Sequence, residues 1–203
     1  MPFDDYGLCF LAGGQARRMG GGDKGEITVD GQTIIAHLIA RFSDAPYLFL
    51  NANGDSARFA HYGLDVVPDL MADYQGPLCG IYSAMCHLKQ THPAMKWLAV
   101  LPTDAPLLPA RLIDDLRQAA LQTGAKLVSV KSKGRTHPVI GLWSLSVCDA
   151  LGKALTEEGV RKIDLFTSAI GCHYVDYDGK QDPFLNLNRP EDVTAYRGLL
   201  ASN

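Results

Sequence analysis

The sequence predicts an α/β protein with a mostly parallel sheet, helices on both faces and a late antiparallel insertion near 126–143. Short apolar runs of strand length alternate with segments of helical apolar spacing through the first two thirds of the chain. No internal repeat, low-complexity tract or Pro/Ser linker interrupts this alternation. Alternating strands and helices typically build a parallel sheet that helices cover on both sides.

The chain length bounds the number of domains. A chain of 203 residues, 47% hydrophobic and 20% charged, is long enough to form one well-packed hydrophobic core but short for two separate cores. We therefore expect a single domain over 1–203.

Strands are expected where short apolar runs end at turn residues or prolines. The clearest run is 97–101, which leads directly into Pro102-Thr103-Asp104-Ala105-Pro106. The run at 47–50 ends at Asn51-Ala52-Asn53-Gly54. Asparagines at the carboxyl end of a strand are well placed to contact a ligand, although Asn-Gly also favours a simple turn. The remaining strands are expected at 8–12, 64–67, 126–130, 139–143 and 173–175, with a short extended piece at 26–29.

Helices are expected where apolar residues recur at helical spacing. One begins at Thr33, and Pro77 suits the first turn of another. Gly124 is a suitable stop for a third, because glycine commonly ends helices. The expected helices after the first are 77–89, 109–123, 145–155 and 162–169, with a final helix after Pro190. A loop is expected at 70–76. A basic turn at 131–135 is expected to join the strands at 126–130 and 139–143 into a hairpin.

The loop after the first strand carries the strongest functional signal. It is rich in glycine and contains Arg17, Arg18 and Lys24. Glycines let successive backbone N–H groups turn toward one point, and Arg and Lys supply charge for phosphate oxygens. The loop therefore predicts a triphosphate site.

An ordinary glycine-rich turn with solvated arginines is the alternative interpretation of this loop. The two known nucleotide-binding motifs that the loop partly matches do not decide between a phosphate site and an ordinary turn. Gly20, Gly22 and Gly25 fit G-x-G-x-x-G, but the match begins well after the strand has ended. A P-loop is excluded because Lys24 is followed by glycine and not by Ser or Thr.

Charge and hydropathy limit the possible partners. A net charge of −3 and an isoelectric point near 6.0 leave no general polyanion-binding surface, so nucleic acid is not an expected partner. The first seven residues, MPFDDYG, contain two acids and no apolar run of the length of a signal peptide. No apolar stretch elsewhere approaches the ~18 residues of a membrane span. We therefore expect a soluble, cytoplasmic protein without a membrane partner.

Five cysteines are widely spaced and include no C-x-x-C pair and no histidine at ligand spacing. They are interpreted as small buried hydrophobic residues. Cys79 is the one that falls within an expected site segment, GPLCG.

Five segments resemble one known family. LAGGQARRMGGGDKG at 11–25 resembles the opening signature of the molybdenum cofactor guanylyltransferases, which is close to LAGG-x-x-x-RMGG-x-DKG. That signature belongs to a wider group of nucleotidyltransferases that begin LA[AG]G-x-x-x-RM. Further similar segments are GPLCGI at 76–81, LPTDAPL at 101–107, HPVIGLW at 137–143 and NLNRPED at 186–192.

The resemblance implies a Rossmann-like, three-layer αβα nucleotidyltransferase fold. It also implies an activity, the transfer of GMP from GTP to the terminal phosphate of molybdenum-molybdopterin with release of pyrophosphate. Other cofactor-biosynthesis proteins and the acceptor molybdoenzymes are then the expected protein partners. No protein nucleophile is needed for this reaction.

The donor site needs cations and a divalent metal, because charge moves onto the leaving pyrophosphate. Mg²⁺ is expected, and Asp104 is the candidate ligand, although an Asp at a strand end also serves as a cap or turn residue. Lys24, Asp104 and Arg18 are the catalytic candidates. Carried over from the family, the GTP contacts are Leu11, Ala12, Gly13, Gly14, Lys24, Asn51, Asp69, Gly80 and Asp104.

The acceptor is expected on the C-terminal half of the chain, because a pterin phosphate needs cations and amide donors. His137 has the alternative of ending a hairpin strand, and Arg161-Lys162 that of a solvated helix start. The acceptor candidates are His137, Arg161, Lys162, Asn186 and Asn188.

Two rival functions remain open at the level of sequence. One is a related cytidylyltransferase or sugar-nucleotide transferase, and the second Gly of LAGG argues against the cytidine branch, which resembles LAAG. The other is a non-catalytic GTP-binding module, against which the presence of Lys24 and Asp104 argues. The chain departs from the family pattern at Thr103, where Cys is frequent, and at Glu26, where an apolar residue is usual.

Overall fold

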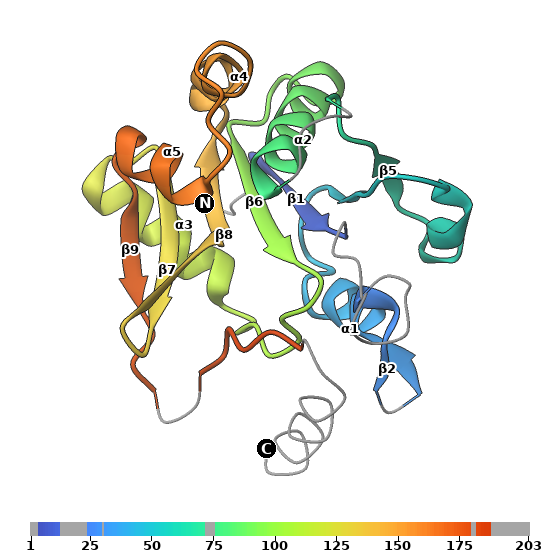
Figure 1. Ribbon diagram of the computed structural model, residues 1–203. Helices are drawn as coiled ribbons and strands as arrows, with labels where there is room; N and C mark the ends of the chain where they lie inside the picture. The colour runs from blue at the N-terminus through green and yellow to red at the C-terminus, as the bar shows by residue number, and fades with distance from the viewer. Residues whose placement is uncertain (1–3, 13–23, 30, 72–75, 180–181, 188–203) are drawn as a thin grey trace.

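The computed structural model describes residues 4–12, 24–29, 31–71, 76–179 and 182–187. Its main feature is a seven-stranded sheet with the strand order β5-β4-β1-β6-β8-β7-β9 (Figure 1). The strands are β1 (Tyr6–Leu11), β4 (Leu48–Asn51), β5 (Asp65–Val67), β6 (Trp97–Pro102), β7 (Leu127–Ser132), β8 (Arg135–Ser144) and β9 (His173–Asp176).

The sheet is mostly parallel, as the sequence predicts. β1 pairs in parallel with both β4 and β6, β4 with β5, and β7 with β9. β8 is antiparallel to both of its neighbours, β6 and β7, and so forms the expected late antiparallel insertion. Lys133 and Gly134 connect β7 to β8 with φ of 48° and 74°. A two-residue turn with positive φ at both positions matches the twist of a hairpin.

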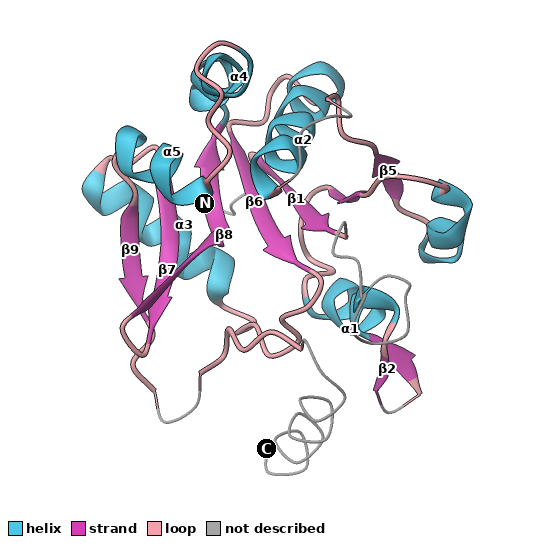
Figure 2. Ribbon diagram, viewed as in Figure 1, coloured by secondary structure: helices cyan, strands magenta, loops and turns pink. Residues whose placement is uncertain are grey.

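Helices cover both faces of the sheet in three layers (Figure 2). On one face α1 (Ile34–Arg41) and α3 (Leu112–Thr123) contribute to one hydrophobic cluster. On the other face α2 (Pro77–Thr91), α4 (Cys148–Thr156) and α5 (Ile163–Ile170) contribute to a second.

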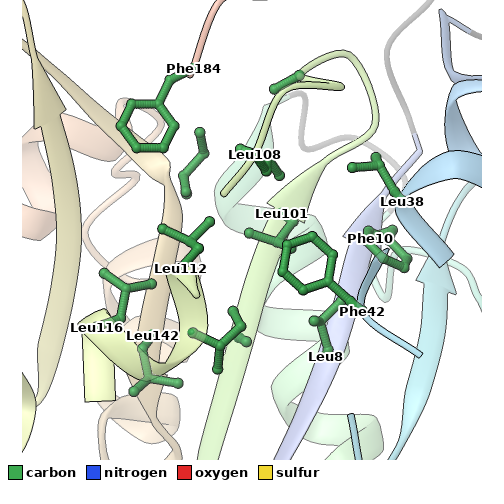
Figure 3. Close-up of a cluster of buried hydrophobic side chains, with 14 of the residues drawn as sticks. Leu8, Phe10, Leu38, Phe42, Leu101, Leu108, Leu112, Leu116, Leu142 and Phe184 are labelled. Atoms are coloured by element: carbon green, nitrogen blue, oxygen red, sulfur yellow. The ribbon is translucent and has the colours of Figure 1, made fainter. Parts of the chain in front are cut away.

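Alternation along the central strands divides the core between these faces. Leu8 and Phe10 of β1 join the α1/α3 cluster, whereas Cys9 between them joins the other. Such alternation follows from the period of two in side-chain direction along a strand. Figure 3 shows Phe10 and Leu101 in the α1/α3 cluster, which also includes Phe184 from the C-terminal segment.

Several helix boundaries differ from the predictions. The helix expected from Pro109 begins at Leu112, because Pro109 closes a turn by accepting from the Leu112 N–H at 3.0 Å. The segment 145–147 forms a 3-10 helix, η4 (Leu145–Val147), before α4 begins. The first helix begins after Thr33, whose hydroxyl accepts from the Ala36 N–H as an N-cap. The helix expected after Pro190 lies outside the described residues.

Short elements flank the first helix and the second strand. The piece expected at 26–29 divides into η2 (Lys24–Glu26) and β2 (Thr28–Val29), which pairs with β3 (Gln32–Thr33). A further 3-10 helix, η3 (Ser56–Tyr62), was not expected. Asp55 caps it by accepting from the Ala57 N–H at 2.9 Å, and it ends at Gly63.

The strand order reverses between β1 and β6. From β1 the chain moves outward to β4 and β5, and then returns to the other side of β1 as β6. In open α/β sheets this reversal creates a crevice outside the carboxyl ends of the strands, where ligands bind. The fold therefore places the expected ligand-binding crevice at the ends of β1, β4, β5 and β6.

Candidate functional site at the carboxyl edge of the sheet

The carboxyl ends of three strands meet in register at this edge. Leu11 is paired with Asn51 on one side and with Pro102 on the other. The Ala12 N–H donates to the Asn51 carbonyl at 2.8 Å, which holds the chain at the start of the glycine-rich loop. Asp104 follows β6 by two residues. Leu11, Ala12, Asn51 and Asp104, all proposed from sequence, thus come to one edge.

Asp69 follows β5 by two residues, and two asparagine side chains fix its carboxylate. The Asn51 amide donates to Asp69 Oδ1 at 2.9 Å and to the Val67 carbonyl at 3.0 Å. The Asn53 amide donates to Asp69 Oδ2 at 2.8 Å, and Asn53 Oδ1 accepts from the Asp69 N–H at 2.8 Å. Both carboxylate oxygens therefore have an amide donor, which orients Asp69 at the edge.

Sequence reasoning assigned Asn51 and Asp69 to the nucleotide and included Asn53 only in the general expectation for the asparagines at this strand end, without its contact with Asp69. The signal was the repeated asparagine of Asn51-Ala52-Asn53, which places two amides on the same side of an extended chain. The alternative of a simple Asn-Gly turn does not account for these contacts, because both amides bind Asp69 across the strand pair.

Gly80 lies in the first turns of α2, in close contact with the end of the sheet. A Cβ at this position would lie 2.3 Å from Asn51 Oδ1 and 3.2 Å from Leu11 Cδ2. A glycine is therefore required for α2 to approach the Asn51 side chain. Pro77 occupies the first helical position, as expected, and Gly76 before it has a φ of 124°.

Cys79 precedes Gly80 and is buried. Its thiol contacts the Met71 carbonyl, with Sγ 3.5 Å from that oxygen. Burial raises the pKa of the Cys79 thiol, so the protonated form dominates at neutral pH. A buried protonated thiol is a packing group and a poor nucleophile, in agreement with the sequence interpretation.

Thr103 ties the turn that carries Asp104 to β1. Its backbone N–H and its hydroxyl both donate to the Leu11 carbonyl, at 3.3 and 3.2 Å. A Cβ on Gly25 would lie 2.9 Å from Thr103 Cβ, so the end of the glycine-rich loop is packed against this turn. The departure from the family pattern at Thr103 thus has a structural role, because the hydroxyl adds a bond between β1 and the turn.

The departure at Glu26 also has a local explanation. The Tyr62 hydroxyl donates to Glu26 Oε1 at 2.8 Å and lies 2.6 Å from the Thr33 hydroxyl. A polar residue at Glu26 therefore joins η2 to η3 and to the start of α1.

The donor set at this edge fits a divalent metal bound together with a nucleotide. The described residues contain no cluster of three or more His, Cys, Asp or Glu placed to hold a metal alone. Mg²⁺ is usually held by one or two carboxylates with phosphate oxygens and waters completing its shell. Asp104 is half-buried at the edge and is suited to that role.

The acceptor candidates fall in two places, and the first surrounds His137. Its Nε2 lies 3.0 Å from the Ser132 hydroxyl, which donates to Asp182 Oδ1 at 2.7 Å. Its ring centroid lies 5.1 Å from that of Phe184. Burial lowers the pKa of His137, Asp182 opposes this and Arg135 adds to it. The lowered pKa favours the neutral form of His137, so this candidate is better suited to hydrogen-bonding an acceptor than to supplying a positive charge.

The second place lies beside the start of α2. A Cβ on Gly76 would lie 3.6 Å from the Arg161 carbonyl oxygen. The Arg161 guanidinium donates to the Leu155 carbonyl at 3.3 Å, and Lys162 is the exposed N-cap residue of α5. These cations thus border the helix that approaches Asn51.

The C-terminal segment 182–187 connects the two sides of the edge. Phe184 is buried beside His137, and the Leu187 N–H donates to the Asp104 carbonyl at 2.7 Å. Asn186 is exposed between them. The candidates outside the described part of the chain are Gly13, Gly14, Arg17, Arg18, Asn188 and the side chain of Lys24.

Comparison with known proteins identifies the family. The model of the MobA-like NTP transferase domain matches residues 8–168. A molybdenum cofactor guanylyltransferase of Bradyrhizobium sp. (strain ORS 278) is 42% identical over 193 residues, covering 94% of this chain and 91% of the relative. One from Rhodopseudomonas palustris (strain HaA2) is 40% identical over 191 residues, covering 93% and 89%. The chain belongs to the molybdenum cofactor guanylyltransferase family.

Solved structures confirm the fold of this guanylyltransferase family member. Molybdopterin-guanine dinucleotide biosynthesis protein A from Archaeoglobus fulgidus has a TM-score of 0.79 at 20% identity, covering 97% of this chain and 99% of its own. A CMP:2-keto-3-deoxy-manno-octonic acid synthetase complexed with CTP has a TM-score of 0.71 at 13% identity, covering 98% and 99%. At such identities the likeness concerns the fold, which cytidylyl- and guanylyltransferases share.

Family membership makes the chain a nucleotidyltransferase, and a divalent metal is consistent with that class. In the part of the guanylyltransferase that the structure describes, no helix is both long and apolar enough to cross a membrane.

Proposed function

We propose that this chain transfers GMP from GTP to the terminal phosphate of molybdenum-molybdopterin, forming the guanine dinucleotide cofactor and pyrophosphate. The observation that carries the proposal is the identity of 40–42% to proteins named molybdenum cofactor guanylyltransferase over more than nine tenths of the chain. The carboxyl edge supports it, because the described residues among those implied for the nucleotide lie together there: Leu11, Ala12, Asn51, Asp69, Gly80 and Asp104. In the reaction an acceptor phosphate oxygen bonds to the α-phosphorus of GTP as its bond to the β-phosphate oxygen breaks.

The donor half of the site supplies position and charge. Lys24 and the backbone amides of the glycine-rich loop would hold the triphosphate, with Arg18 as a second cation, because developing negative charge is stabilised by fixed donors. Asp104 would hold Mg²⁺ together with phosphate oxygens. When bound, that ion neutralises charge on the phosphates. Asp69 and Asn51, which are hydrogen-bonded to each other at 2.9 Å, would present hydrogen-bonding groups to the nucleoside of GTP.

The acceptor half supplies cations and amides from the C-terminal part of the chain. Arg161 and Lys162 are proposed to bind the phosphate of the pterin, because both are exposed cations beside the start of α2. His137 and Asn186 are proposed to hydrogen-bond the pterin, and Asn188 to assist. His137 acts here in its neutral form, since burial lowers its pKa.

A thermal-shift comparison of the four nucleoside triphosphates with Mg²⁺ tests the proposal. At a hundred times its Kd a ligand adds about 2.7 kcal/mol of apparent stability. We expect GTP to raise the Tm most. Equal stabilisation by CTP or ATP would contradict the guanylyl assignment and favour a related cytidylyl- or sugar-nucleotide transferase.

Pyrophosphate release separates an enzyme from a binding module. With GTP, Mg²⁺ and molybdenum-molybdopterin we expect release to depend on the acceptor. Binding of GTP without any release of pyrophosphate in the complete mixture would favour the non-catalytic alternative.

We further propose that the reaction takes place in the cytoplasm and that the product passes to other cofactor-biosynthesis proteins and to molybdoenzymes.

A further inference from the structure

Two thiols that the proposed reaction does not use face each other between α2 and α4. Cys86 lies in α2 and Cys148 is the first residue of α4. Their sulfur atoms are 3.8 Å apart, although the residues are 62 positions apart in the sequence. Both cysteines are reduced in this structure.

Two side-chain contacts join the helices around this pair. A Cβ on Gly152 of α4 would lie 2.9 Å from Cε2 of Tyr82 in α2, so the end of the Tyr82 ring packs directly against α4 at this glycine. The Lys89 ammonium of α2 pairs with the Asp149 carboxylate of α4 at 3.0 Å. The contact between the two sulfur atoms therefore lies between helices that these two further contacts also hold together.

Other thiols in the chain have different partners. Cys79 Sγ and Cys172 Sγ each contact a backbone carbonyl oxygen, at 3.5 and 3.4 Å. Cys9 is fully buried within β1. The contact between Cys86 and Cys148 is thus distinct from the way these three sulfurs are accommodated.

We propose that Cys86 and Cys148 form a reversible disulfide when the protein meets a low-molecular-weight disulfide such as oxidised glutathione. An S–S bond is about 2.05 Å long, so the sulfurs must approach by about 1.7 Å. That approach requires rotation about the side-chain bonds and a small shift of α4 against α2. The bridge would fix α2, whose first turns contact Asn51 and Leu11 through Gly80.

Accessibility sets the order of the steps. Cys86 is half-buried and Cys148 is 2% exposed, so Cys86 meets the oxidant first. Burial raises the pKa of the Cys148 thiol, its neighbour Cys86 adds to this, and Lys89 opposes it. A protonated, buried Cys148 cannot attack a disulfide in solution, but it lies within reach of a sulfur bonded at Cys86.

The exchange balances in two steps. The Cys86 thiolate attacks one sulfur of oxidised glutathione, and a glutathione thiolate leaves with the electron pair of the broken S–S bond. Cys148 then attacks Cys86 Sγ, and its proton passes to the second glutathione thiolate as that thiolate leaves. Two protein thiols are oxidised by two electrons, and one glutathione disulfide is reduced to two thiols.

Thiol counting and peptide mapping test the bridge directly. The reduced, folded full chain is incubated with oxidised glutathione, quenched in acid and alkylated. We expect two of the five thiols to be lost and a linked peptide containing Cys86 and Cys148 to appear. Dithiothreitol should restore all five thiols.

Matched variants assign the linkage. Cys86→Ser and Cys148→Ser should give no intramolecular bridge, whereas Cys172→Ser, which removes another half-buried thiol, should behave as the wild type. Mapping of the wild type alone decides the question if the buried Cys148→Ser variant fails to fold. The proposal is overturned if the wild type carries only a persistent glutathione adduct at Cys86, if it shows no oxidation, or if another cysteine forms the bridge.

Discussion

Asp104 shows how one side chain can be tested apart from the fold that presents it. The turn that carries it is held by bonds that do not use the Asp104 side chain, since the Asp104 carbonyl accepts from the Leu187 N–H and both the N–H and the hydroxyl of Thr103 donate to the Leu11 carbonyl. We expect Asp104→Asn to fold normally, because the change is nearly isosteric. It should lower turnover by about 10²-fold or more, because one charge is lost from the proposed metal site.

Steady-state rates measured over a range of Mg²⁺ concentrations check this prediction, with circular dichroism as the control for folding. Wild-type turnover of Asp104→Asn at saturating Mg²⁺ would refute the assignment of Asp104 as the metal ligand.

Gly80 provides a second test on the scale of single residues. In Gly80→Ala the new methyl group would meet Asn51 Oδ1, so α2 or Asn51 must move. We expect a loss of stability of about 1–3 kcal/mol from overpacking and a weaker affinity for GTP, because Asn51 also fixes Asp69.

A double-mutant cycle with Asn51→Ala, measured by urea unfolding, provides the control. Removing the Asn51 side chain removes the clash, so the two changes should be non-additive by about 0.5 kcal/mol or more, as for residues in direct contact. Additive losses would show that Asn51 does not limit the space at Gly80.

On the scale of elements, a contact that joins α2, β5 and the residue before β4 makes stability depend on pH. The Tyr47 hydroxyl donates to Asp65 Oδ2 at 2.7 Å and lies 2.8 Å from His87 Nε2. Because Tyr47 gives its proton to Asp65, the neutral His87 ring donates from Nε2 to the Tyr47 oxygen. Burial lowers the pKa of His87 below its usual value near 6.5, Asp65 opposes this, and His92 adds to the lowering.

The sign of the pH effect follows from this lowered pKa. The unfolded chain binds the His87 proton more readily than the folded chain does, so protonation favours unfolding. The stabilisation is present above pH 6.5 and is lost as the pH falls below it. Urea unfolding between pH 7.5 and 5.5 should show a smaller loss of stability in His87→Gln than in the wild type. Identical pH profiles would contradict the prediction.

On the scale of the whole molecule, the donor and acceptor groups come from different halves of the chain. Lys24 lies in η2, next to the Asp104 turn through the contact of Gly25 with Thr103, whereas Arg161 and Lys162 lie between α4 and α5. Lys24→Ala should lower kcat by roughly 10²–10³-fold and weaken GTP binding less, because its contact strengthens as charge moves onto pyrophosphate.

Loss of the acceptor cations should have a different signature. Arg161→Ala combined with Lys162→Ala should raise the KM for the acceptor and leave GTP affinity nearly unchanged, as expected for groups that position only the second substrate. Calorimetric titration with GTP and kinetics in the acceptor measure the two effects. A large loss of GTP affinity in this double variant would contradict the placement of the acceptor site.

The sequence by itself determined the alternation of strands and helices, the buried strands and the turn chemistry, and it predicted a triphosphate site. These are local properties, since the run of 97–101 and the spacing from Thr33 are set by neighbours along the chain. The resemblance then assigned Leu11, Asn51, Asp69 and Asp104 to one nucleotide. Helix starts such as Leu112 in place of Pro109 depended on turn hydrogen bonds that composition does not specify.

Only the tertiary structure decided which of these residues touch. Strand order brings the ends of β1, β4, β5 and β6 together, and no local pattern in the sequence encodes that order. The two amides that fix Asp69, the close approach of Gly80 to Asn51, and the contact of Cys86 with Cys148 all join distant segments. The neutral state of His137 likewise depends on burial by Phe184 and other residues that pack around it only when the chain folds.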